Sequence, residues 1–228
     1  MKKVCCSTAA GALVALAVLA SCASAPASSA ASGPQAAPQQ SAREAAIEAA
    51  RPIRTAPAVR PDWIDIVPKS GTELSFVGAS LRFATDAQAR NNAQEDGRRQ
   101  LVDYYGTLMA NKAREYTATA GISGEVFSPQ IAAQQLNERI AQNVAQALGA
   151  AQFYTEVYLD SANREAYQVY VLMEIARSRV AQVIDDYGRE QAADYAKRAA
   201  AEQDAARKQQ LEKTAEFFGG NLSGALDL

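Results

Sequence analysis

The chain offers few side chains for covalent or acid–base chemistry. Its 228 residues include no histidine and only three cysteines, Cys5, Cys6 and Cys22, all near the N-terminus. The absence of histidine excludes Ser/His and Cys/His nucleophile systems and histidine-ligated metal sites. Because no cysteine follows position 22, the rest of the chain can form no disulfide, thiolate nucleophile or cysteine–metal cluster.

Carboxylates are the remaining candidates for catalysis. Glu156 and Glu174 fall on two segments that we expect to pair as neighbouring strands, and two acids in a cleft can act together. Both are expected on the wetter face of the sheet, where cross-strand polar pairing explains them without catalysis. Asp185 and Asp186 are adjacent in an expected helix, so their side chains point in different directions. The sequence also lacks a Walker loop, a dinucleotide fingerprint and a zinc signature. We therefore expect no enzyme, no cofactor and no metal site.

The N-terminus has the features of an export signal. Two lysines precede an apolar stretch at residues 9–20, a pattern that is typical of a secretory signal and too short for a membrane-spanning helix. The stretch ends in Leu19-Ala20-Ser21-Cys22, which resembles the lipobox of bacterial lipoproteins. The resemblance implies that residues 1–21 are removed as a signal peptide, that Cys22 receives a diacylglycerol and that its new amino group is acylated.

Two alternatives to lipidation stay open. The segment Ala23-Ser24-Ala25 offers an ordinary small-x-small cleavage site, although Pro26 directly after it generally blocks cleavage; otherwise Cys22 is a free thiol. Two or three acyl chains on Cys22 would anchor the chain permanently, because each buried methylene contributes about 0.8 kcal/mol. Ala23 is not the aspartate that retains many lipoproteins in the inner membrane, so the resemblance implies the outer membrane.

Composition divides the rest of the chain into a linker, a domain and a tail. Residues 22–60 are rich in Ala, Ser, Pro and Gln and contain no aromatic residue, which predicts a disordered linker. Trp63, in a Pro-Asp-Trp segment, marks the start of a domain over 61–188 and is expected to pack at its edge. Residues 189–228 mix acids, bases and alanines, which predicts a long charged helix that projects from the domain or frays in solvent. The pair Phe217-Phe218 is expected to be exposed and to pack against an unidentified surface.

Hydrophobic periodicity predicts an α+β domain, with a small antiparallel sheet of about three strands and two to three helices on one face. A strand is expected over 74–80, and a helix begins at Thr85, which can cap it. The buried stripe of this helix recurs every four residues and starts with small residues, so the helix can lie close to the sheet. Gly97 in that stripe is expected to have a packing reason, because a helical glycine costs about 1 kcal/mol against alanine. Ser128-Pro129 predicts the start of a second helix, and a last helix begins near Ala176.

The clearest strands lie at residues 152–160 and 166–175, whose alternation predicts an antiparallel hairpin with one mainly apolar face. The other face carries Tyr154, Tyr158 and Tyr170. Aromatic residues are common in binding interfaces, because they bury area at low entropic cost, and they are also good strand formers. We therefore consider these three tyrosines a possible partner surface.

Several of these features together resemble one lipoprotein family. The lipobox, the polar linker, the Pro-x-Trp start, and Phe76-Val77-Gly78 before a helix with Ala89, Ala93 and Gly97 make residues 63–187 similar to the Lpp-twenty type of bacterial envelope lipoprotein. They are also similar to related domains of flagellar accessory lipoproteins. The resemblance implies a non-enzymatic α+β domain attached to the outer membrane, which in some members helps to build collars or scaffolds around the flagellar motor. The long charged tail departs from that pattern.

The sequence supports two functional hypotheses. The first is a non-catalytic outer-membrane lipoprotein that acts as an envelope scaffold or assembly module, with a flagellar association implied by the resemblance. Its partners would be the membrane, through Cys22, and envelope proteins or a second copy of the chain. The alternative is a module that binds a small molecule, a glycan or a lipid. A formal net charge of −2 gives no general attraction to phosphates, so a nucleic acid is not an expected partner.

Overall fold

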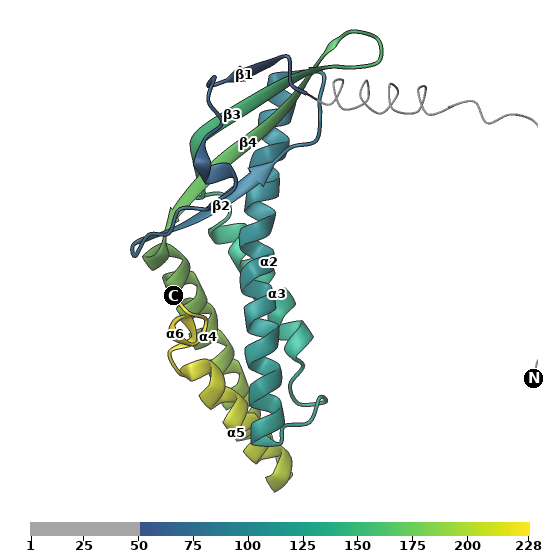
Figure 1. Ribbon diagram of the computed structural model, residues 1–228. Coiled ribbons are helices and arrows are strands. Elements are labelled where there is room, and N and C mark those ends of the chain that lie inside the picture. Colours follow the sequence, from purple (N-terminus) through teal and green to yellow (C-terminus); the bar gives the residue numbers. More distant parts are fainter. Residues whose placement is uncertain (1–50) are drawn as a thin grey trace, which may run out of the picture. The chain divides into compact units, whose positions relative to one another are not determined.

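A computed structural model describes residues 51–228 of the chain (Figure 1). The predicted signal peptide, Cys22 and most of the predicted linker lie outside the described residues. The described part confirms the α+β class, with four strands where about three were expected. In chain order its elements are β1 (Arg54–Ala56), the 3-10 helix η1 (Asp62–Ile64), β2 (Glu73–Ala79), α2 (Asp86–Ala120), α3 (Pro129–Asn143), β3 (Gly149–Leu159), β4 (Glu165–Ala176), α4 (Arg177–Ala201), α5 (Ala205–Gly219) and α6 (Leu222–Ala225).

The sheet has the strand order β1-β3-β4-β2, and every neighbouring pair is antiparallel. The predicted hairpin is confirmed as β3 and β4, with Thr155 opposite Val169. Strand β1 was not expected, because its residues fall within the predicted linker. It pairs with the free edge of β3, with Arg54 opposite Val157 and Ala56 opposite Thr155. The prediction of a linker that extends to residue 60 is therefore wrong for this segment.

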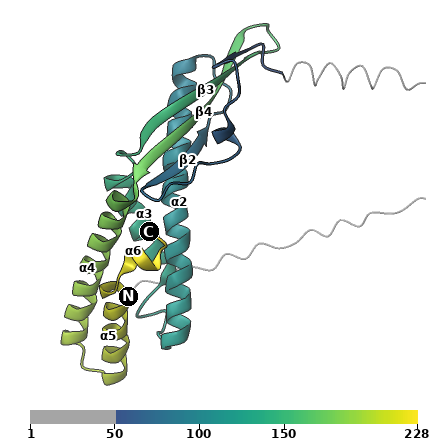
Figure 2. The ribbon, with the colours of Figure 1, turned by 60° about the vertical axis from the view of Figure 1, so that its left-hand side comes forward.

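Helix α2 lies along one face of the sheet and continues beyond it (Figures 1 and 2). Thr85 caps its first turn through the amide of Gln88, as expected. The predicted small-residue stripe faces the sheet. A Cβ added at Gly78 of β2 would lie 2.7 Å from the backbone nitrogen of Gly97, and a Cβ on Gly97 would lie 2.7 Å from the sulfur of Met173. The packing reason expected for Gly97 is thus confirmed, because two glycines allow the helix to lie close to the sheet.

The other helices pack mainly on α2 and on one another rather than on the sheet. Helix α3 runs beside α2, and its start at Ser128-Pro129 is as predicted. Helix α4 follows directly from β4, α5 folds back along α4, and α6 also contacts α4 (Figure 2). We expected two to three helices on one face of the sheet, but only α2 packs extensively against it.

The C-terminal region differs from the predicted projecting helix. Residues 189–228 form the end of α4, a turn, α5 and α6, and they return to the core. Phe218 is buried and Phe217 packs against the same cluster, so the predicted exposure of this pair is wrong. The buried apolar side chains of this region are Ala199, Leu211, Phe218, Leu222 and Leu226. Among residues 51–228, no helix has the length and hydropathy needed to cross a membrane.

Candidate interaction surfaces

The segment between β1 and β2 crosses the sheet on the face opposite α2 (Figure 1). We call residues 57–67 the strap. Trp63 anchors it: its ring packs with Tyr154 and Leu172, and its Nε1 donates a hydrogen bond to Oε1 of Gln152 at 2.9 Å. The expected packing role of Trp63 is confirmed. Because the ring of Trp63 packs on β3 and β4, the strap covers part of the face that we expected to be solvated.

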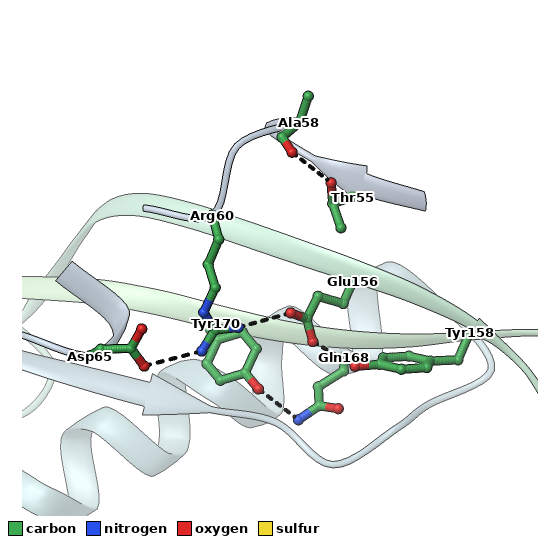
Figure 3. A network of polar contacts seen from close by, with 8 residues as sticks. All are labelled: Thr55, Ala58, Arg60, Asp65, Glu156, Tyr158, Gln168 and Tyr170. Atoms are coloured by element: carbon green, nitrogen blue, oxygen red, sulfur yellow. Dashed lines mark hydrogen bonds and ion pairs between the residues drawn. The ribbon is translucent and has the colours of Figure 1, made fainter. Parts of the chain in front are cut away.

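Arg60 fastens the strap through charge (Figure 3). Its guanidinium donates to Glu156 on β3 at 2.9 Å and to Asp65 at 3.3 Å. The same group lies 5.1 Å from the ring centroid of Tyr170 and 5.9 Å from that of Tyr154, within cation–π range. The hydrogen bond to Asp65 raises the pKa of Arg60, because it favours the charged guanidinium. We call Arg60, Asp65, Glu156, Tyr154 and Tyr170 the clamp.

Tyr158 completes the hydrogen bonding of Glu156. Its hydroxyl donates to the second carboxylate oxygen at 2.7 Å, so each oxygen of this buried acid is engaged (Figure 3). Burial raises the pKa of Tyr158 to about 12, and the bond to Glu156 adds to that increase. Both oxygens of this buried carboxylate therefore have partners, as is usual for buried polar groups in folded proteins. Its partners make it a poor candidate for a general base.

The three predicted surface tyrosines are brought together, but they do not form an open surface. Tyr154 and Tyr158 are only 3% and 6% exposed, and Tyr170 is half-buried. The expectation that this face is solvated is therefore wrong, because the strap and Arg82 lie over the rings. A partner could reach Tyr154 only by displacing the strap.

The two carboxylates considered for catalysis lie far apart. Glu156 is opposite Gln168, whereas Glu174 is opposite Gly149 near the other end of the strands. At about 3.4 Å per residue, the six residues from Gln168 to Glu174 place the two acids about 20 Å apart. Their position on neighbouring strands therefore does not bring the two acids together in one cleft. Among residues 51–228, no group of three or more acidic side chains is arranged to hold a metal ion.

A different surface lies at the tip of the β3–β4 hairpin and was not found from the sequence. A groove of about 530 Å³ runs between the loop after β2 and the hairpin, lined by Arg82, Phe83, Tyr158, Leu159 and Arg164 among others. Leu81 beside it is 75% exposed, and Leu159 and Ile53 are also exposed. We call Ile53, Leu81, Arg82, Leu159 and Arg164 the hairpin-end surface. The sequence gives no signal for it, because its members come from three separate segments.

Arginines surround this groove. The guanidinium of Arg82 lies 3.5 Å from the ring centroid of Tyr158. Arg164 pairs with Asp160 at 2.8 Å, and Arg54 pairs with Glu165 at 3.7 Å. No carboxylate of residues 51–228 forms an ion pair with Arg82. The groove's own lining is balanced in charge, with Arg82 and Arg164 against Asp160 and Glu165, and Arg54 beside it adds one further positive charge.

No protein-family model, curated protein or solved structure matches this chain. The resemblance to the Lpp-twenty type therefore stays a prediction.

Proposed function

We propose that the chain is a non-catalytic lipoprotein of the outer membrane, anchored through acyl chains on Cys22, whose folded part is an envelope scaffold or assembly module. A flagellar association is the setting that the family resemblance implies. The partner is a second copy of the chain or another envelope protein. No cofactor takes part in this function.

The observation that supports an assembly role is that the strap packs one side chain on the sheet and exposes large apolar side chains to solvent. It turns Trp63 onto the sheet and leaves Val59 and Ile66 79% and 73% exposed. Large aliphatic side chains on a segment that the clamp already holds in place are suited to a protein contact, because their burial by a partner releases water from apolar surface at little cost in ordering the segment.

Site-specific crosslinking in intact cells tests this proposal. A photoreactive amino acid replaces Ile66 in the strap or, as a matched control, the exposed Ile131 at the start of α3. The proposal predicts adducts of discrete mass from position 66 that exceed those from position 131. The mass of the adduct distinguishes a second copy of the chain from a different protein. Equal or absent adducts at the two positions would count against an assembly role of the strap.

The groove beside Tyr158 favours a second candidate function, the binding of an anionic small molecule, glycan or lipid. Its lining combines the aromatic edge of Phe83 and Tyr158 with the guanidinium of Arg82. Apolar walls with a few directed polar groups are typical of ligand sites. The Arg82→Ala variant should then lose affinity for an anionic ligand and lose at most about 1 kcal/mol of stability, the worth of its contact with the ring of Tyr158. Titration calorimetry and a thermal melt measure the two effects.

A further inference from the structure

The chain enters the folded part at the hairpin end. The backbone nitrogen of Ile53 donates to the carbonyl of Val157 at 2.7 Å, and Arg54 pairs with Glu165 at the start of β4. The segment that leads to Cys22 is therefore attached beside the tip of the β3–β4 hairpin. If Cys22 carries acyl chains, as the proposed function holds, this end receives the connection to the membrane.

The same end carries exposed apolar and basic side chains. Leu159 and Arg82 line the groove, and the exposed Leu81 directly precedes Arg82 in the chain. The acids Asp160 and Glu165 are already paired with arginines. Arg82 has no ion-pair partner among residues 51–228. Exposed leucines beside such an arginine are suited to the interface of an anionic bilayer, with the leucines among the acyl chains and the arginine at a phosphate.

The opposite end of the molecule lies far from the point where the chain enters the folded part. Helix α2 has 35 residues and begins beside the hairpin end, where Asp86 accepts a hydrogen bond from Thr155. At 1.5 Å per residue it is about 52 Å long. Ile131, in the first turn of α3, follows the loop after the far end of α2.

We propose that the hairpin-end surface lies against the phospholipid bilayer that holds Cys22. The inference rests on the proposed anchor and adds the orientation of the folded part: the sheet end faces the lipid, and α2 leads away from it. Leu81 and Leu159 enter the interfacial region, and Arg82 faces lipid phosphate.

Depth-dependent fluorescence quenching tests this orientation. The full lipidated chain is purified and reconstituted into vesicles of phosphatidylethanolamine and phosphatidylglycerol. A single cysteine replaces Leu81 or, as the control, Ile131, and carries an environment-sensitive dye. Signal removal eliminates Cys5 and Cys6, and lipidation occupies Cys22, so the introduced thiol is the only one that reacts. Lipids with spin-labelled acyl chains should quench the dye at position 81 about threefold more than the dye at position 131.

Three outcomes are informative. Equal quenching at positions 81 and 131, with the chain still bound to the vesicles, overturns the orientation and leaves the anchor intact. A free thiol at Cys22 with no binding to vesicles refutes the anchor, and the inference falls with it. Arg82→Glu should reduce the quenching of the dye at position 81. Arg179→Glu, which changes an exposed arginine near the start of α4, should leave this quenching unchanged. Equal effects of the two variants would contradict the role given to Arg82.

Discussion

The two ends of the described chain are attached to the core in opposite ways. The strap is held by Arg60 between two carboxylates and two tyrosine rings, with Trp63 as its one buried anchor. The C-terminal helices are held by apolar contact. Phe218 lies 5.5–5.8 Å, ring centroid to ring centroid, from three neighbours, in edge-on or stacked arrangements: Phe127, Tyr187 and Tyr195.

This difference separates two kinds of stability. Contacts between apolar rings scale with buried area and are insensitive to salt, whereas an ion pair with a partly exposed arginine weakens as ionic strength rises. The strap should therefore be the part of the fold that responds to solution conditions, and the C-terminal helices the part that tolerates them. Four predictions test this contrast.

The largest effect is expected at the aromatic cluster. Phe218→Ala removes a side chain that is 2% exposed and leaves a cavity between α4, α5 and α3. We expect a loss of about 3–5 kcal/mol in the free energy of unfolding, measured by urea denaturation. Phe217→Ala is the control, because this neighbouring ring is only partly buried and should cost less. Similar losses for both would show that the cluster does not depend on the buried ring.

A smaller effect is expected at the clamp. Glu156→Ala leaves the hydroxyl of Tyr158 buried without its acceptor and frees one side of Arg60. We expect a loss of about 2–3 kcal/mol and faster proteolysis within the strap. Glu156→Gln keeps an acceptor for Tyr158 and should lose less. If Glu156→Ala leaves the rate of strap cleavage unchanged, the clamp does not hold the strap.

The pKa of Tyr158 predicts a loss of stability in alkali. Its pKa of about 12 in the folded protein lies above the ordinary tyrosine value of 10.0, so between these pH values the folded protein binds the proton more tightly than the unfolded chain. The contribution is complete below about pH 10 and is lost as the pH rises through about 12, a change of about 2–3 kcal/mol. Urea midpoints across this range should fall less steeply for Tyr158→Phe than for the wild type. Identical slopes would exclude Tyr158 from the alkaline transition.

Salt should give the smallest effect and the most direct contrast. Hydrogen exchange measured in low and in 1 M salt (Debye length about 3 Å) should show weaker protection of β1 and the strap at high salt. The change should be under about 1 kcal/mol, because Arg60 is partly exposed. Protection in α5 should not decrease. A parallel change in both regions would remove the distinction between them.

Sequence periodicity predicted what depends on local pattern. The buried stripe of α2, the cap at Thr85 and the β3–β4 hairpin follow from spacing and turn residues, and the close approach at Gly97 follows from its cost in a helix. The strap escaped prediction because its contacts are distant: Arg60 meets Glu156 across 96 positions. The packing of Phe218 against Phe127 escaped for the same reason, since charge and alanine content alone are typical of a solvated helix.

The candidate surfaces were harder to predict than the fold. The tyrosines at positions 154, 158 and 170 were correctly placed together on one face, but the alternation of a strand does not show what covers that face. The hairpin-end surface joins an exposed leucine from the loop after β2 with one at the end of β3, and exposed and buried leucines look alike in a sequence.

The measurement that tests the central claim most directly is the intact mass of the chain together with its membrane fractionation, compared with the Cys22→Ala variant. The account predicts cleavage before Cys22, a mass increment of lipid size, and loss of firm membrane attachment in the variant. An unmodified wild-type chain cut at another position, or a Cys22→Ala chain that stays as firmly attached as the wild type, would contradict it.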